Sequence, residues 1–281
     1  MKILITGAAG YLGRGITTRV LDLGHEVIAT DICTKEVDER AMKIDCNLFD
    51  VDNPFDFFGK PDVLLHLAWE DGFIHNSEKH ISQLELHYKF IKKIVESDIS
   101  RISIMGSMHE IGFYEGSIDE NTPCRPQSLY GISKNTLRNL SELIAKEHSK
   151  VFQWLRGFYI VGNSNKGNSI FSKIVQSEMK GETVFPFTTG QNQFDFLDYN
   201  EFCYQVAVVV NQSKISGIIN ICSGFPERLS DRVERFLAEN NYKIRLEYGK
   251  FPDRPYDSKA VWGNNKKIEN IMYNFKDNSE S

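Results

Sequence analysis

The sequence predicts an α/β protein built on a doubly wound parallel sheet, with a small C-terminal lobe for a substrate. Short apolar, strand-like runs alternate with helix-like segments, as expected when helices cover both faces of a parallel sheet. Three glycines also follow the first of these runs, where the chain must turn into a helix. The strand-like runs span residues 2–6, 26–31, 62–68, 102–107, 153–162 and 217–223.

The first strand and helix have the clearest pattern. The first apolar run comes directly after Met1, so we expect no targeting peptide before it. Apolar residues then recur with helical spacing between residues 12 and 23, and this helix is expected to end at Gly24. The second strand is expected to end at Asp31.

The alternation loosens after about residue 163, which indicates two domains built from separated segments. Amphipathic helices are expected at 170–180 and 228–241. The predicted nucleotide-binding domain comprises residues 1–163 and about 191–222. The predicted lobe comprises about 164–190 and 223–275, and residues 276–281 are expected to form a disordered tail.

Composition narrows the possible partners. The net charge of −5 comes from interspersed acidic and basic residues, which disfavours binding to nucleic acid or to an anionic membrane. The five cysteines are scattered without a CxxC pair, so neither a disulfide framework nor a metal site is predicted. No apolar run is long enough to span a bilayer. We therefore expect a cytoplasmic protein.

The glycine turn predicts a dinucleotide site. Gly7, Gly10 and Gly13 allow a tight turn, close approach of the backbone to a pyrophosphate, and packing of the helix on the strand. The helix N-terminus then faces the phosphates with its free N–H groups.

Two carboxylates follow at positions suited to the adenosine half of a dinucleotide. Asp31 can accept hydrogen bonds from both ribose hydroxyls, and it would repel a 2′-phosphate, so NAD is favoured over NADP. Arg14 adjoins the turn and keeps NADP as the less favoured alternative. Asp45 can bind the adenine amino group or can be an ordinary loop residue. His66 is expected to be a structural residue inside a buried strand.

The segment "PQSLYGISK" carries the predicted chemistry. Tyr130 and Lys134 are four residues apart and so share one face of a helix. A nearby ammonium stabilises a tyrosinate, and the lysine can also hold the hydroxyls of the nicotinamide ribose. Ser107 is expected at the carboxyl end of a strand, where its hydroxyl can bond the reacting oxygen while Tyr130 exchanges the proton.

These residues resemble the NAD-dependent epimerase/dehydratase family of extended short-chain dehydrogenases/reductases, and the resemblance extends over nearly the whole chain. The family's glycine fingerprint matches the turn, and its catalytic serine, tyrosine and lysine match Ser107, Tyr130 and Lys134. Its "HLA" segment matches His66 to Ala68. The resemblance implies a Rossmann fold, and it adds Tyr11, Leu12, Leu67 and Ala68 to the cofactor-binding residues. It also implies a homodimer.

In this family the small lobe usually closes over a nucleotide-diphosphate sugar. The resemblance implies that Arg254 clamps the diphosphate, and the other candidate substrate-binding residues are Trp69, His109, Asn168 and Lys173. One departure is Phe194 at the position of a family arginine that also reaches the phosphates, for which Lys173 or Arg254 would compensate. Three phenylalanines, at 185, 187 and 194, are candidates for stacking on a base or sugar, or for the core.

Three reactions use this apparatus. A 4,6-dehydratase usually has an Asp-Glu pair beside the catalytic residue, and none follows Ser107. The compact lobe favours a reductase over a 4-epimerase with tightly bound NAD. The segment around residues 106–138 resembles 4-ketoreductases that make deoxythymidine-diphosphate (dTDP) 6-deoxyhexoses for surface polysaccharides. A non-catalytic dinucleotide-binding protein is disfavoured because Tyr130 and Lys134 are both present. Glu110 and His109 are candidates for acid/base groups, substrate selection or packing.

Overall fold

The predicted α/β class is confirmed by a seven-stranded sheet. The computed structural model describes residues 1–165, 169–252 and 258–279. All neighbouring strands of the large sheet run parallel. The order reverses direction at β1, as in a doubly wound fold. In spatial order the strands are β3 (Met42–Asp45), β2 (Glu26–Asp31), β1 (Lys2–Thr6), β4 (Val63–His66), β5 (Arg101–Ser107), β7 (Val151–Gly157) and β11 (Gly217–Ile221).

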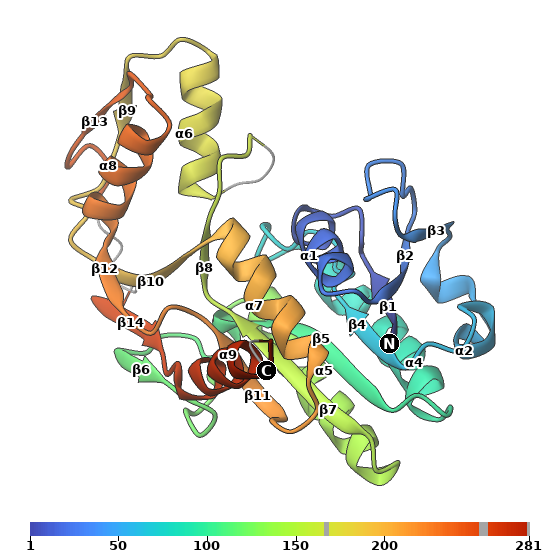
Figure 1. Ribbon diagram of the computed structural model, residues 1–281. Coiled ribbons are helices and arrows are strands. Elements are labelled where there is room, and N and C mark those ends of the chain that lie inside the picture. Colours follow the sequence, from blue (N-terminus) through green and yellow to red (C-terminus); the bar gives the residue numbers. More distant parts are fainter. Residues whose placement is uncertain (166–168, 253–257, 280–281) are drawn as a thin grey trace.

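Helices cover both faces of this sheet (Figure 1). One face packs against α1 (Tyr11–Asp22), α7 (Tyr199–Asn211) and α9 (Lys266–Ser279), with Ile16, Val206 and Ile268 in a shared core. The other face packs against α4 (Leu84–Val95) and α5 (Leu129–Glu147), with Phe90 and Leu137 in a second core. The remaining short elements are η1 (Leu48–Asp50), α2 (Pro54–Phe57), α3 (Lys79–Ser82) and η2 (Met108–Glu110). We call the large sheet and these helices the nucleotide domain.

A lobe with its own core stands to one side of the large sheet, at the upper left in Figure 1. Its helices, α6 (Ile170–Met179) and α8 (Leu229–Glu239), confirm the two amphipathic helices expected there. Their apolar faces meet around Phe171, Phe187 and Phe236. Two small sheets complete the lobe and join it to the nucleotide domain. Their strands are β12 (Pro226–Arg228), β10 (Gln193–Asp198), β14 (Ala260–Gly263), β6 (Gly116–Ile118) and β8 (Tyr159–Val161), and then β13 (Arg245–Glu247) with β9 (Val184–Pro186).

The structure differs from the predicted division into domains at both ends of the lobe. Strand β10 was expected in the nucleotide domain, but it pairs with β8, β12 and β14 in the second sheet. Helix α9 was expected partly in the lobe and partly in a disordered tail from residue 276. Instead it continues to Ser279 and packs on α7 and β11. The reason is apolar burial, since Ile268 and Ile271 lie in the core of the large sheet.

Asp195 fixes the junction between the two sheets. Its carboxylate is fully buried and accepts four hydrogen bonds, two at each oxygen. The donors are the backbone and hydroxyl of Ser223 and the backbone N–H groups of Gly224 and Gly263, at 2.7 to 3.0 Å. Since β14 and the segment after β11 both donate to this carboxylate on β10, Asp195 sets how the lobe leaves the large sheet.

A buried ion pair joins β5 and β7 at their carboxyl ends. Arg156 on β7 donates from Nε to Glu110 Oε1 at 2.5 Å, and both side chains are fully buried. The indole of Trp154 donates to the other oxygen of Glu110 at 2.8 Å. The turn that follows Ser107 is thereby tied to β7.

Replacing Glu110 by Gln is expected to destabilise the protein by about 3–5 kcal/mol, because the Arg156 guanidinium would stay buried without its counter-charge. The free energy of unfolding in urea measures this. Glu120→Gln is the matched control, because Glu120 pairs with Lys267 at the surface and should cost about 0–1 kcal/mol. Equal stability of the two variants would show that the buried pair is not a structural requirement.

Candidate active site

The glycine turn brings β1, α1 and β4 so close together that no side chain fits between them. Gly7 has φ +71°, and a Cβ there would lie 2.6 Å from the backbone nitrogen of Ala68. A Cβ on Gly13 would lie 2.2 Å from the carbonyl oxygen of Gly7. Glycine is therefore required at both positions. Leu67 and Ala68 follow β4, so the turn faces the point where the strand order reverses.

The first turn of α1 carries free backbone donors. Gly10 is its N-cap residue and makes no capping side-chain hydrogen bond. The first hydrogen bond within the helix runs from Arg14 N–H to the Gly10 carbonyl at 3.2 Å, so the N–H groups of Tyr11, Leu12 and Gly13 precede it. Such a helix end is suited to binding a phosphate.

Asp31 lies where a ribose would follow the phosphates. Its carboxylate accepts from the backbone N–H of Ala9 at 3.0 Å and of Ile32 at 2.8 Å, which holds it beside the glycine turn. A carboxylate has about four lone-pair sites, so acceptor capacity remains for ribose hydroxyls. Arg14 is paired with Glu36. A positive charge beside the turn is thus already neutralised, which agrees with the preference for NAD over NADP.

The other predicted cofactor residues have definite partners. Asp45, the last residue of β3, accepts from the backbone and hydroxyl of Thr34, at 2.8 and 2.5 Å, and these bonds lower its pKa. Asp45 thereby orders the loop beyond Asp31. The ring of Tyr11 lies 4.7 Å from that of Tyr199, whose hydroxyl donates to the Tyr11 carbonyl at 2.6 Å. Together the close-packed glycine turn, the uncapped helix and Asp31 fit a dinucleotide of the NAD type.

The structure brings Ser107, Tyr130 and Lys134 together. Ser107 ends β5 and is 8% exposed, and its hydroxyl lies near the Tyr130 side chain. Lys134 is 4% exposed, and its ammonium donates to the carbonyl of Met105 at 3.0 Å. That ammonium lies 6.0 Å from the centre of the Tyr130 ring. The arrangement places a hydroxyl pair and a buried cation at the carboxyl end of β5.

Burial decides the protonation of these groups. Burial raises the pKa of Tyr130 to about 12, although the nearby Ser107 hydroxyl acts in the opposite direction. Burial lowers the pKa of Lys134 to about 7, and the negative charge of Glu110 opposes this. At neutral pH Tyr130 is therefore a phenol that can donate a proton, and Lys134 is close to the midpoint of its titration.

Two histidines that we did not single out from the sequence, His75 and His80, lie beside Tyr130 together with the predicted His109. The His75 ring stacks on the Tyr130 ring, with 5.5 Å between the ring centres and an angle of 10° between the planes. The centre of the His80 ring lies 5.3 Å from that of Tyr130. His109 lies 4.4 Å from His75. The signal available in the sequence was the local abundance of histidine, because five of the seven histidines fall between residues 66 and 109. The sequence does not show that these histidines meet at the ring of Tyr130, because they are far from Tyr130 along the chain.

The open alternatives for the residues after Ser107 are narrowed by their contacts. Glu110 is held in the buried pair with Arg156, so its role is packing and electrostatics. The backbone N–H of His109 donates to the Ser107 hydroxyl oxygen at 3.3 Å. Burial and the neighbouring His75 lower the pKa of His109 to about 4, so its imidazole is neutral. His66 is buried and bonded to Thr6 at 2.8 Å, as expected of a structural histidine.

The candidate substrate residues are divided between the two domains. Trp69 lies in the site, and the centre of its ring is 6.2 Å from that of the Tyr130 ring. Lys173, in contrast, is exposed on α6 of the lobe. Asn168 and Arg254 lie outside the described residues. Of the three phenylalanines considered for stacking, Phe187 is 1% exposed and lies in the core of the lobe. Its position makes it a core residue and not a ligand-stacking one.

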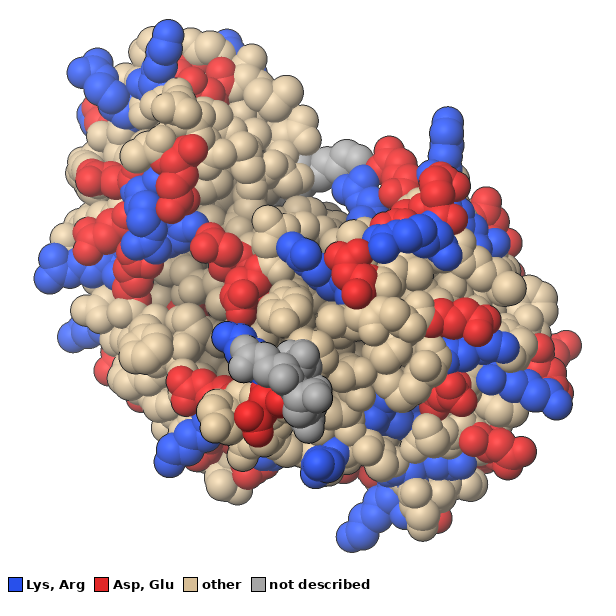
Figure 2. All heavy atoms as spheres, viewed as in Figure 1, with Lys and Arg blue, Asp and Glu red and all other residues tan. Residues whose placement is uncertain are grey.

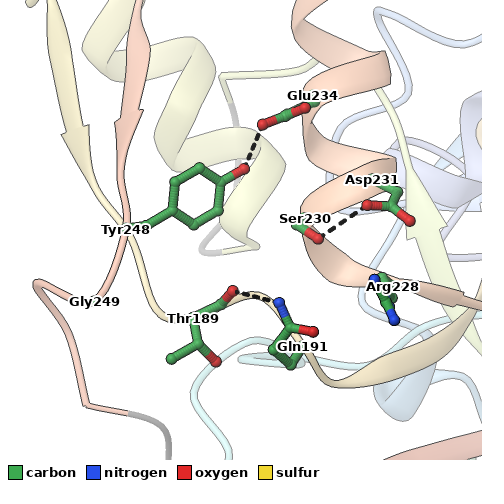
Figure 3. Close-up of a pocket in the computed structure, with 8 residues that line it drawn as sticks. All are labelled: Thr189, Gln191, Arg228, Ser230, Asp231, Glu234, Tyr248 and Gly249. Atoms are coloured by element: carbon green, nitrogen blue, oxygen red, sulfur yellow. Dashed lines mark hydrogen bonds between the residues drawn. The ribbon is translucent and has the colours of Figure 1, made fainter.

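A separate cavity of about 550 Å³ opens in the lobe (Figure 3). Tyr248 points across it to Glu234, and their hydrogen bond of 2.5 Å closes one side. It contains none of the residues predicted for the cofactor or the substrate. Its lining comprises Thr189, Gln191, Arg228, Ser230, Asp231, Glu234, Tyr248 and Gly249.

Comparisons with known proteins show the family of the chain. The model of the NAD dependent epimerase/dehydratase family matches residues 3–222. The dTDP-6-deoxy-L-talose 4-dehydrogenase (NAD(+)) of Aggregatibacter actinomycetemcomitans is 40% identical over 271 residues, covering 94% of this chain and 99% of that protein.

Solved structures show the same fold. The UDP-glucuronic acid 4-epimerase of Bacillus cereus, with UDP-glucuronic acid and NAD, has a TM-score of 0.82 at 18% identity, covering 97% of this chain and 93% of that one. The UDP-N-acetylglucosamine 4-epimerase of Methanobrevibacter ruminantium has a TM-score of 0.83 at 19% identity, covering 96% and 91%. The chain therefore belongs to the NAD dependent epimerase/dehydratase family, within the extended short-chain dehydrogenases/reductases.

Proposed function

We propose that this protein uses NADH to reduce the 4-keto group of a dTDP-linked 6-deoxyhexose, in the synthesis of surface-polysaccharide precursors. The observation that carries this proposal is the trio at the end of β5. Tyr130 is held as a phenol near the Ser107 hydroxyl, with the Lys134 ammonium 6.0 Å from the centre of its ring. A ketone that receives a hydride needs a proton donor at its oxygen, and Tyr130 is that donor.

Each residue then has one task. The dinucleotide supplies the hydride when bound. Tyr130 gives its proton to the sugar oxygen as that oxygen becomes an alkoxide, and Ser107 donates a hydrogen bond to the same oxygen. Lys134 holds the ribose hydroxyls with its remaining donors and stabilises the tyrosinate left behind. Glu110 is held in its buried pair with Arg156 and takes no part in proton transfer.

The relative from A. actinomycetemcomitans supports this choice of substrate. Its name describes oxidation at C4 of a dTDP-6-deoxy sugar, which is the reverse of a 4-keto reduction. The same acid and base serve both directions. We assign Trp69 and His109 to the sugar side of the site, and Lys173, Asn168 and Arg254 to the diphosphate. A 4-epimerase is the alternative that the test must separate, since the neighbours in fold carry that name.

The surface agrees with a small-molecule substrate. Figure 2 shows Lys and Arg interspersed with Asp and Glu over the visible face, without a patch of one sign. The face seen in Figure 2 offers no electrostatic footprint for nucleic acid. Within the described ranges, no helix has both the length and the apolarity to cross a membrane.

The purified protein is expected to oxidise NADH when given dTDP-4-keto-6-deoxyglucose, or to reduce NAD when given dTDP-6-deoxy-L-talose. Absorbance of the reduced nicotinamide follows both reactions, and NMR of the product gives the configuration at C4. Conversion of one C4 epimer into the other, without net change in added nicotinamide, would instead establish the epimerase.

Tyr130→Phe is the control for the mechanism. It is expected to lower turnover by roughly 10²–10⁴-fold, because the proton donor is lost, while NAD still binds. Wild-type turnover in this variant would exclude Tyr130 as the acid.

Asp31→Asn is expected to weaken the preference for NADH over NADPH by about tenfold or more, a free-energy change of about 1.4 kcal/mol. The carboxylate that repels a 2′-phosphate is neutralised in this variant. The ratio of kcat/KM for the two cofactors measures the change. Asp52→Asn removes the same charge from an exposed loop and should leave the ratio unaltered. An unchanged ratio in Asp31→Asn would remove Asp31 from cofactor selection.

We also propose a homodimer formed through α4 and α5. Helices α3, α4 and α5 pack side by side, and they expose apolar side chains. Ile132 and Leu143 are 42% and 55% exposed and lie on one face of α5, and Leu86 on α4 is 39% exposed. A face of this kind suits an isologous contact between two copies.

Leu143→Arg is expected to convert the dimer to a monomer, because a charge would be buried at the two-fold contact. Light scattering after size exclusion measures the mass. Met179→Arg on α6 is the control, since Met179 is 69% exposed on the lobe, away from this face. A Leu143→Arg variant that keeps the mass of two chains would place the contact elsewhere.

A further inference from the structure

The Lys134 ammonium rests on the face of an indole. Its Nζ atom lies 3.9 Å from the centre of the Trp69 ring, closer than to the Tyr130 ring at 6.0 Å. The only hydrogen bond from Nζ among the described residues runs to the Met105 carbonyl at 3.0 Å. Besides that hydrogen bond, the aromatic face of Trp69 is therefore the group that stabilises the charge of this buried lysine, which is 4% exposed.

The indole is held in a fixed orientation. Its Nε1 donates to His80 Nδ1 at 3.1 Å, and His80 in turn donates from Nε2 to the Ile74 carbonyl at 2.9 Å. The ring also stacks on His87, with 4.7 Å between the ring centres and an angle of 17°. Because its N–H is bonded to His80 and it stacks on His87, the indole that contacts Lys134 is held in place.

Few charges act on this ammonium. Glu110 favours its charged form from a distance. His66 and His87 are neutral at physiological pH, because burial lowers the pKa of His87 to about 3 and holds that of His66 well below its usual value. No carboxylate in the described part of the chain forms an ion pair with Lys134. The titratable groups that face it are His66 on β4, His80 on α3, His87 on α4, Glu110 in η2 and Tyr130 on α5.

We propose that Trp69 is a positioning residue that keeps Lys134 charged and in place through a cation–π contact, and so sets the alkaline limit of catalysis. The catalytic part of this inference rests on the proposed function, in which Lys134 must be an ammonium. The contact itself is a property of the cofactor-free protein. This role is separate from the contact with the sugar that we assign to Trp69 above.

The direction of the effect follows from the charge. The quadrupole of an aromatic face stabilises a cation and does nothing for a neutral amine, so the contact raises the lysine pKa. Burial has already brought this pKa to about 7. Loss of the ring is expected to lower it by about one further unit. The ammonium would then be lost at lower pH, and the alkaline limb of the activity profile would move down.

The first test is an NMR titration of the cofactor-free protein labelled with ¹³C at lysine Cε. The resonance absent from Lys134→Met assigns Lys134. Trp69→Leu should lower its pKa by about one unit, whereas Trp69→Phe, which keeps an aromatic face, should remain closer to the wild type. Trp69→Met repeats the comparison should the leucine variant fold poorly. An unchanged pKa in the non-aromatic variants, or equal shifts in the leucine and phenylalanine variants, would overturn the inference.

The second test is the pH dependence of kcat in the same variants. The alkaline limb should move to lower pH in Trp69→Leu and should recover in Trp69→Phe, whereas a merely structural defect would lower kcat equally at all pH values. An unmoved limb overturns the catalytic role of Trp69. A shifted lysine pKa in a protein that turns over neither dTDP sugar would uphold the contact and refute the proposed function, so the two failures are distinguishable.

Discussion

The buried ion pair between Glu110 and Arg156 is the interaction on which the site depends. A buried charge is tolerated only with a partner, so Glu110 must meet Arg156, and the turn after β5 has little freedom. That turn carries Ser107 and His109. Arg156 also donates to the carbonyl of Asp119 at 2.8 Å, which ties in the segment after β6. The charge of Glu110 then opposes the effect of burial on the Lys134 pKa.

The surroundings of Lys134 suit a lysine that must stay charged and also keep donors for a ligand. A carboxylate in contact would secure the charge, but it would occupy ammonium protons that the ribose hydroxyls require. The carbonyl of Met105 takes one donor, and the face of Trp69 stabilises the cation without accepting a conventional hydrogen bond. The dry surroundings that lower the lysine pKa also raise that of Tyr130, so the phenol retains its proton until a substrate needs it.

Much of the site could be predicted because its signals are local. The glycines act within one turn, and Tyr130 and Lys134 lie one helical turn apart. The positions of His75 and His80 beside Tyr130 could not be found in this way, because α3 and the segment before it meet α5 only in three dimensions. The position of α9 could not be predicted either, because the sequence of a helix does not show which element its apolar side packs against. In the structure, Ile268 and Ile271 are buried in the core of the large sheet.

The sequence by itself determined the parallel α/β class and the family, and it predicted the dinucleotide turn and the three residues of the proposed catalytic site, because periodicity and short motifs express backbone geometry directly. Only the tertiary structure decided which sheet holds β10, whether Glu110 is an acid or a structural ion, and which ring supports Lys134. These outcomes depend on burial and on contacts between residues far apart in the chain. Desolvation, which sets the protonation of Tyr130 and Lys134, exists only once the elements have packed together.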